Sequence, residues 1–199
     1  MSAYVTQYNE TLFPEGGYTV NDPLFDVLRA FDDSGVAGEH TGVPNYGGFW
    51  GGDAFSGTSY GFTSATVDGY AFVATGNLTY DFPTHTLWGS LESITLGAGV
   101  TSTGEVVSPF LTIEFDAALQ GTLAEGRANV VHDVLWGLMN GSVDGASDSA
   151  GTVSPGGLIA ALEDQGVTAG TTVADLYVPG AADLVGDFAV TETEYALAA

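Results

Sequence analysis

The chain has 199 residues, of which 45% are hydrophobic and 12% aromatic, which is enough for one domain with a buried core and argues against disorder. It has 25 acidic residues and only two basic ones, Arg29 and Arg127, which gives a net charge of −23. This charge excludes nucleic acid and anionic lipid as partners, because binding to either needs clustered basic residues. There is no cysteine, which excludes disulfides, zinc–thiolate sites, iron–sulfur clusters and thiol catalysis.

The first quarter of the chain predicts short strands, one helix and a long loop. Residues 2–20 are expected to form short strands broken by a Pro-Glu-Gly-Gly turn. Asn21-Asp22-Pro23 is typical of a helix start, with a capping side chain followed by proline. Helical spacing then predicts an amphipathic helix over residues 23–32, on the apolar positions Leu24, Phe25, Leu28 and Phe31. Residues 33–57 hold eight glycines and four aromatics, which favours a functional loop.

The rest of the chain predicts strands and then helices. Alternation of apolar and polar residues predicts strands across residues 58–117. Helices are expected over residues 129–140, from Ser154-Pro155 onward, and over residues 171–177, whereas the tail from residue 187 has no core pattern. Because the strands do not alternate with helices, the order indicates an α+β fold with an antiparallel sheet.

The sequence shows neither an N-terminal secretory signal nor a membrane-spanning segment. Met1–Tyr8 lacks the basic and apolar regions of a Sec signal peptide, and no apolar run approaches the roughly 18 residues that span a bilayer. We therefore expect no membrane insertion. Taken alone, these features would predict a cytoplasmic protein.

Three histidines and one tyrosine are the candidates for chemistry. His40, in the glycine-rich loop, is either an exposed loop histidine or a metal ligand on a mobile loop. Tyr80 ends a strand-like run and His85 begins the next one. A histidine bonded to the phenol oxygen would favour the phenolate, a hard donor that prefers Fe(III), but a buried tyrosine beside an unrelated turn histidine fits the same spacing. His132 lies beside the apolar face of a predicted helix, in register with Trp136, and is interpreted as structural.

No enzyme signature is present. The sequence has no nucleophile elbow, no zinc-protease helix motif, no P-loop and no dinucleotide fingerprint. Pairs of carboxylates do occur, but a chain with 25 acidic residues contains some by chance. We therefore expect a protein that is not an enzyme.

Four segments, taken in their order along the chain, resemble segments of a known family. They are Glu39-His40-Thr41-Gly42 with Gly47-Gly48-Phe49, Gly76-Asn77-Leu78-Thr79-Tyr80 with His85-Thr86-Leu87-Trp88-Gly89, Gly126-Arg127 with Val131-His132 and Gly137-Leu138-Met139-Asn140-Gly141, and Ala196-Leu197-Ala198-Ala199. With these segments, most of residues 15–145 and the C-terminal end resemble the HasA-type bacterial haemophores. The interval from Tyr80 to His85 is shorter than in the family, and the loop around His40 differs in length.

This resemblance implies a fold and a ligand. The fold would be a single domain with a curved antiparallel sheet backed by several helices, holding ferric haem b between two loops. Tyr80 and His40 would be the axial iron ligands, with His85 bonded to the phenol oxygen of Tyr80. Arg127 would lie near the haem, and Met139 would line the pocket.

The resemblance also implies a location and partners. Members of the family are secreted, extracellular proteins of iron acquisition that scavenge haem, for example from haemoglobin, and deliver it to an outer-membrane receptor. They leave the cell through an ABC (type I) exporter that reads an uncleaved C-terminal signal. On this basis residues 1–186 would form the haemophore domain, and residues 187–199 a flexible tail with the secretion signal.

Two other functions fit the composition. One is a secreted, acidic adhesive protein whose aromatic, glycine-rich loop binds a partner without haem. The other is an acidic, calcium-dependent hydrolase without a known motif. Binding of hemin would separate both from a haemophore.

Overall fold

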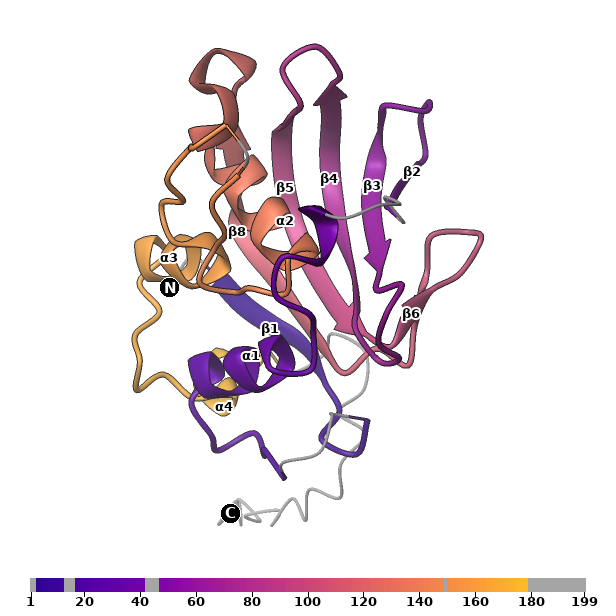
Figure 1. The fold of residues 1–199 in the computed structure, drawn as a ribbon. Coiled ribbons are helices and arrows are strands. Elements are labelled where there is room, and N and C mark those ends of the chain that lie inside the picture. Colours follow the sequence, from indigo (N-terminus) through magenta and orange to yellow (C-terminus); the bar gives the residue numbers. More distant parts are fainter. Residues whose placement is uncertain (1–2, 13–16, 42–46, 149, 179–199) are drawn as a thin grey trace, which may run out of the picture.

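A six-stranded antiparallel sheet with helices packed on one face forms the core of the protein (Figure 1). This computed structural model describes residues 3–12, 17–41, 47–148 and 150–178. The strand order across the sheet is β1-β8-β5-β4-β3-β2, and a two-stranded hairpin, β6-β7, adjoins it. The α+β class and the antiparallel sheet agree with the pattern read from the sequence.

The elements follow one another along the chain as strand, helix, strands and helices. They are β1 (Ala3–Tyr8), α1 (Leu24–Asp32), the 3-10 turn η1 (Glu39–Thr41), β2 (Gly48–Trp50), β3 (Ser56–Thr63), β4 (Ala71–Asp81), β5 (Thr86–Gly97), β6 (Gly99–Val100), β7 (Val106–Val107), β8 (Leu111–Gly121), the 3-10 segment η2 (Leu123–Ala128), α2 (Val130–Met139), α3 (Gly157–Asp164) and α4 (Val173–Leu176).

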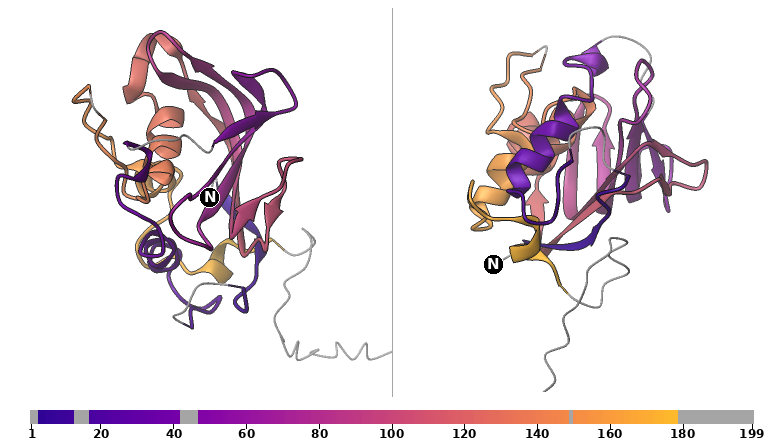
Figure 2. Two further views of the ribbon diagram at one scale, coloured as in Figure 1. Left: turned by 45° about the vertical axis from the view of Figure 1, so that its right-hand side comes forward. Right: turned by 90° about the horizontal axis from the view of Figure 1, so that it is seen from below.

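The two long central strands, β4 and β5, form the axis of the sheet. Their register pairs Ala71 with Gly97 at one end and Asp81 with Thr86 at the other, so the short turn after Asp81 projects from the end of the sheet. The register shifts between Thr75 and Gly76, where a Cβ atom would collide with the carbonyl of Ser90. Glycine at position 76 therefore permits the bulge that bends the sheet. Figure 2 shows the resulting curvature.

The apolar stripes predicted from helical spacing face the sheet. In α2 the side chains of Val131, Val134, Leu135 and Leu138 are all buried, and the helix ends at Asn140 and Gly141 as expected. Helices α1, α2 and α3 lie on the same side of the curved sheet (Figure 2), and the hydrophobic core fills the space between the two layers. This packing fixes α2 against the end of the sheet that carries the β4–β5 turn.

Three boundaries differ from the sequence prediction. The first helix begins at Leu24, and its N-cap residue is Pro23, whose side chain has no hydrogen-bond acceptor. The Asp22 carboxylate, expected to cap the helix, instead accepts hydrogen bonds from Thr19. The third helix begins at Gly157 rather than at Ser154-Pro155. The segment 33–57, expected to be a loop, includes strand β2, which pairs with β3. In the described part of the chain, the helices are too short or too polar to cross a membrane.

Candidate functional site

A cavity opens between α2 and the end of the sheet where the β4–β5 turn projects. Its volume is about 560 Å³, within the range of about 300 to 1,000 Å³ common for cofactor sites. The predicted residues His40, Tyr80, His85, Arg127 and Met139 all line it, although they come from separate segments of the chain. The rest of the wall is largely aromatic or small, and consists of Gly47, Gly48, Phe49, Ala54, Phe55, Tyr60, Phe82, Leu87, His132, Trp136 and Asp148.

Tyr80 is held near the end of β4 by main-chain and aromatic contacts. Its N–H donates to the carbonyl of Phe55 at 2.7 Å, and its ring adjoins those of Phe55 and Phe82, with ring centroids 6.3 Å and 6.4 Å away. Burial raises the pKa of the Tyr80 phenol above its ordinary value, while Arg127 lowers it and Asp81 raises it. The phenol is therefore protonated at neutral pH and can donate a hydrogen bond.

His85 is the hydrogen-bond partner of this phenol. The distance from the Tyr80 Oη atom to the His85 Nδ1 atom is 2.5 Å. The shortened interval between the two residues is accommodated by a tight turn in which the Asp81 carboxylate accepts hydrogen bonds from the N–H and hydroxyl of Thr84. His85 itself has a φ of 55°, a left-handed conformation that is unusual for a residue with a side chain. The structure thus brings together the two residues that the sequence paired.

Arg127 joins three segments at the rim of the cavity. Its Nε atom donates to the Thr84 carbonyl at 3.0 Å, and its Nη1 atom forms an ion pair with the Asp148 carboxylate at 2.9 Å. The Asp148 side chain is 3% exposed and the Arg127 side chain 20%, so water reaches this pair mainly from the arginine side. Arg127 is also the positive charge that opposes the rise in the pKa of Tyr80.

Met139 lines the inner wall of the cavity from the last turn of α2. It is buried, and its Sδ atom accepts a hydrogen bond from the Tyr60 hydroxyl at 2.9 Å. The thioether is therefore engaged with the wall of the cavity, and its contribution to the site is apolar contact rather than a free donor atom.

His40 lines the same cavity from η1, a segment that is distant in sequence from the β4–β5 turn. Its ring meets the edge of Trp136, with centroids 5.1 Å apart, and lies 6.3 Å from Phe62. Burial lowers the pKa of His40 below its ordinary value, although Glu39 raises it, so the imidazole is neutral at physiological pH. The His40 Nδ1 atom is buried without a hydrogen-bond partner among the described residues. A neutral imidazole in such surroundings can bind a metal.

The neighbouring residue, Glu39, anchors η1 to the turn between β3 and β4. One carboxylate oxygen of Glu39 accepts hydrogen bonds from the Ser64 hydroxyl at 2.9 Å, the Ala65 N–H at 2.7 Å and the Thr66 hydroxyl at 3.1 Å. These contacts set the position of the His40 side chain against the cavity. Residues 42–46 of the predicted ligand loop lie outside the described residues.

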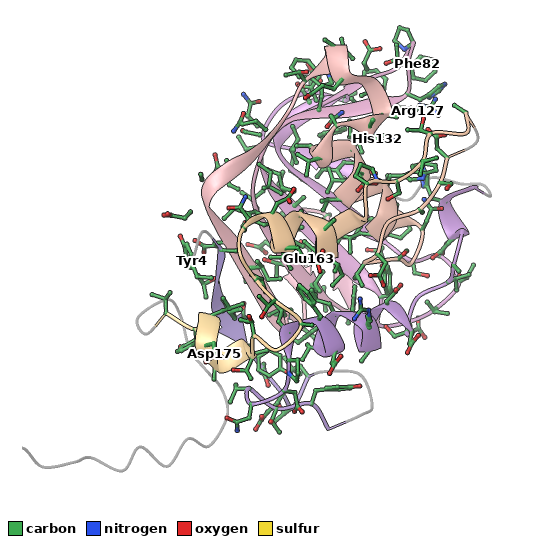
Figure 3. The ribbon with its side chains drawn as sticks, turned by 90° about the vertical axis from the view of Figure 1, so that its left-hand side faces the viewer. Tyr4, Phe82, Arg127, His132, Glu163 and Asp175 are labelled. Atoms are coloured by element: carbon green, nitrogen blue, oxygen red, sulfur yellow. The ribbon has the colours of Figure 1, made fainter. Side chains whose placement is uncertain are left out.

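His132 has a larger part in the site than the sequence indicated. It is 4% exposed, as expected of a packed residue, and its ring stacks on Trp136. However, it also lines the cavity, and its Nδ1 atom accepts the N–H of Leu87 at 3.1 Å. Its helical register with Trp136 was the available signal, since a residue one turn from a cavity-lining aromatic shares its face. Figure 3 shows His132 at the same end of the molecule as Arg127 and Phe82.

Comparison with known proteins identifies the family. The family model described as Heme-binding protein A (HasA) matches residues 1–199. A relative named Hemophore HasA, from Serratia marcescens, is 35% identical over 165 residues, which cover 79% of this chain and 82% of the relative. The chain belongs to the HasA family.

Solved HasA structures share this fold. The holo haemophore HasA from Yersinia pestis superimposes with a TM-score of 0.66 at 22% sequence identity, covering 88% of this chain and 96% of that protein. An apo form of HasA from the same organism gives a TM-score of 0.67 at 21% identity, with the same coverage. The α+β fold, with its curved antiparallel sheet and helices on one face, is therefore confirmed as the HasA fold.

Proposed function

We propose that this member of the HasA family binds ferric haem b in the cavity between Tyr80 and His40. The family to which the chain belongs scavenges haem outside the cell and passes it to a receptor. The observation that best supports our ligand assignment is the 2.5 Å hydrogen bond between the Tyr80 Oη atom and the His85 Nδ1 atom at the wall of the cavity.

The donor set of the cavity suits iron that is already held by a macrocycle. No cluster of three or more His, Cys, Asp or Glu side chains among the described residues is arranged to hold a bare metal ion. The cavity offers instead a phenol and imidazoles among aromatic walls. One or two such axial ligands are sufficient for haem iron, and the aromatic and aliphatic side chains would contact the porphyrin.

Tyr80 is the principal ligand in this proposal, and His85 makes it effective. The Tyr80 phenol must lose its proton to become a strong ligand of Fe(III), and its raised pKa opposes that loss. His85 Nδ1 is placed to receive the proton, and the charge of Arg127 stabilises the phenolate that remains. The hard, anionic oxygen then favours ferric over ferrous iron.

His40 is the second ligand in this proposal, and it carries less of the affinity. Its neutral ring needs no deprotonation before it binds a metal. However, His40 adjoins a glycine-rich stretch, and ordering such a segment around the ligand reduces the net free energy of binding. Tyr80, on a paired strand, needs no comparable ordering.

The remaining family features are proposals for this chain as well. We propose that the protein is a haem carrier rather than an enzyme, that it is secreted through an ABC exporter, and that haemoglobin is one source of its haem. An outer-membrane receptor would receive the haem. The proposed boundary at residue 186 and the secretion signal in residues 187–199 fall outside the described residues.

Titration with hemin tests this function. We expect the purified apo-protein to shift the main absorption band of hemin sharply, with the change complete at one equivalent. Serum albumin, which binds hemin without this site, provides the comparison spectrum. A gradual change with no end point, or a spectrum identical to that of free hemin, would show that the chain is not a haemophore.

A further inference from the structure

Strand β5 extends beyond its neighbour β8 on the side facing α2. The last residue pair between these strands joins Gly89 to Gly121, after which β8 ends and the chain turns into η2. Leu87 lies beyond that pair and is buried, at 3% exposure. Its N–H and C=O point away from β4 and need partners, because buried main-chain polar groups without hydrogen bonds are strongly unfavourable.

Two side chains at the start of α2 supply those partners. The His132 Nδ1 atom accepts the Leu87 N–H at 3.1 Å, and the Asn129 Nδ2 atom donates to the Leu87 carbonyl at 2.9 Å. Asn129 also caps the helix, since its Oδ1 atom accepts the N–H of His132 at 2.9 Å. A Cβ atom at Gly121 would collide with this Asn129 oxygen, so the close approach depends on glycine there.

Leu87 is the residue directly opposite Tyr80 in the sheet. Tyr80 donates its own N–H outward to Phe55, and Leu87 bonds outward to α2, so the two residues form a pair without main-chain hydrogen bonds between them. Side chains in such a pair lie close together. A displacement of Leu87 would therefore change the position of the Tyr80 side chain.

A third contact from the same stretch holds the other side of the turn. The Arg127 Nε atom donates to the Thr84 carbonyl at 3.0 Å. Arg127, Asn129 and His132, which we call the bracket, thus fasten residues 84 and 87 on either side of His85. His85 has the left-handed φ of 55°, and such a conformation persists when surrounding contacts enforce it. Within the turn itself, the Asp81 carboxylate accepts hydrogen bonds from Thr84, and the Thr84 hydroxyl donates to the Thr86 hydroxyl at 3.0 Å.

We propose that the bracket positions His85 against Tyr80 and so compensates for the short turn between them. This inference rests on the proposed function, because it assigns Arg127, Asn129 and His132 as positioning residues for the proposed iron ligand. The contact of the His85 Nδ1 atom with the Tyr80 hydroxyl exists before haem is present, so its dependence on the bracket can be measured in the apo-protein.

The test compares two replacements of His132. Asparagine places its Oδ1 atom near the position of the histidine Nδ1 atom and keeps an acceptor for Leu87, whereas leucine has a similar volume but no acceptor. The chain has three histidines, so a nitrogen-15 spectrum of the histidine-labelled apo-protein contains three ring systems that single variants can assign. In the parent, we expect the His85 Nδ1 shift of a hydrogen-bond acceptor.

His132→Asn should retain that His85 signature, and His132→Leu should lose it. We expect hemin to leave His132→Leu about tenfold faster, at the lower end of the 10- to 100-fold effect of outer-shell partners. If the His85 signature and the release rate are unchanged in His132→Leu, or are altered equally in both variants, the bracket does not position His85.

A second variant keeps the test valid if His132→Leu does not fold. In Asn129→Ser the helix cap is retained, but the shorter side chain cannot donate to the Leu87 carbonyl. We expect the same loss of the His85 signature, and an unchanged spectrum overturns the proposal. Because the histidine spectrum needs no haem, a failure to bind hemin would contradict the proposed function without deciding this inference.

Discussion

Tyr80→Phe is expected to weaken hemin binding by at least about 100-fold, beyond the 10- to 100-fold loss typical of outer-shell residues. The replacement removes the oxygen that would bind iron and leaves the ring. Contacts of that ring with Phe55 and Phe82 should therefore remain, as should the hydrogen bond from the residue 80 N–H to Phe55. Competition with apomyoglobin for hemin measures the change in affinity.

Tyr4→Phe is the matched control for this experiment. Tyr4 lies on β1, remote from Arg127 and His132 in Figure 3, and the same single oxygen is removed. We expect hemin affinity to remain within about twofold of the parent value, since surface changes away from a site have small effects. Equal affinity in Tyr80→Phe and Tyr4→Phe would show that Tyr80 does not hold the iron.

The second large effect concerns pH and His132. Burial, together with the charge of Arg127, lowers the pKa of His132 from 6.5 to about 4, although Asp148 raises it. Between these two values the unfolded chain binds a proton at this residue and the folded chain does not. The contribution of His132 to the free energy of unfolding is therefore complete at pH 7 and falls as the pH drops from about 6.5 to about 4.

The size of this loss follows from the shift in pKa. One pKa unit corresponds to about 1.4 kcal/mol, so the parent should lose about 3 kcal/mol relative to His132→Asn between pH 7 and pH 4. The difference between the two proteins isolates this residue, because the other titrating groups occur in both. Urea unfolding at several pH values measures it, and a constant difference across this range would mean that His132 is not buried in its neutral form.

The elements that the sequence predicted well are those with local causes. In α2 the apolar residues recur at helical spacing and form the face that packs on the sheet; they are Val131, Val134, Leu135 and Leu138. Strand β2 (Gly48–Trp50) was missed because it has only three residues and lies in a glycine-rich stretch, where two aromatic residues alone do not indicate a strand. Its residues become a strand only by pairing with Ser59–Gly61, which the chain brings alongside after folding.

The residues of the candidate site show the same difference between local and long-range causes. The resemblance named His40, Tyr80, His85, Arg127 and Met139, and the fold gathers these residues around one cavity. Helical spacing places His132 beside Trp136, but it cannot reveal the hydrogen bond that His132 accepts, because the partner is the main chain of Leu87, 45 positions earlier in the sequence. The hydrogen bond from Arg127 to the Thr84 carbonyl, beside His85, likewise joins positions 43 residues apart and has no signal in the local sequence.

Resonance Raman spectroscopy of the ferric haem complex tests the central claim most directly. Excitation in the band that arises from charge transfer between phenolate and iron should enhance the ring vibrations of one tyrosinate. These vibrations should shift when the protein contains ring-deuterated tyrosine, remain in Tyr4→Phe and disappear in Tyr80→Phe. A complex of the parent protein with hemin that shows no tyrosinate vibrations, or vibrations that persist in Tyr80→Phe, would contradict the account.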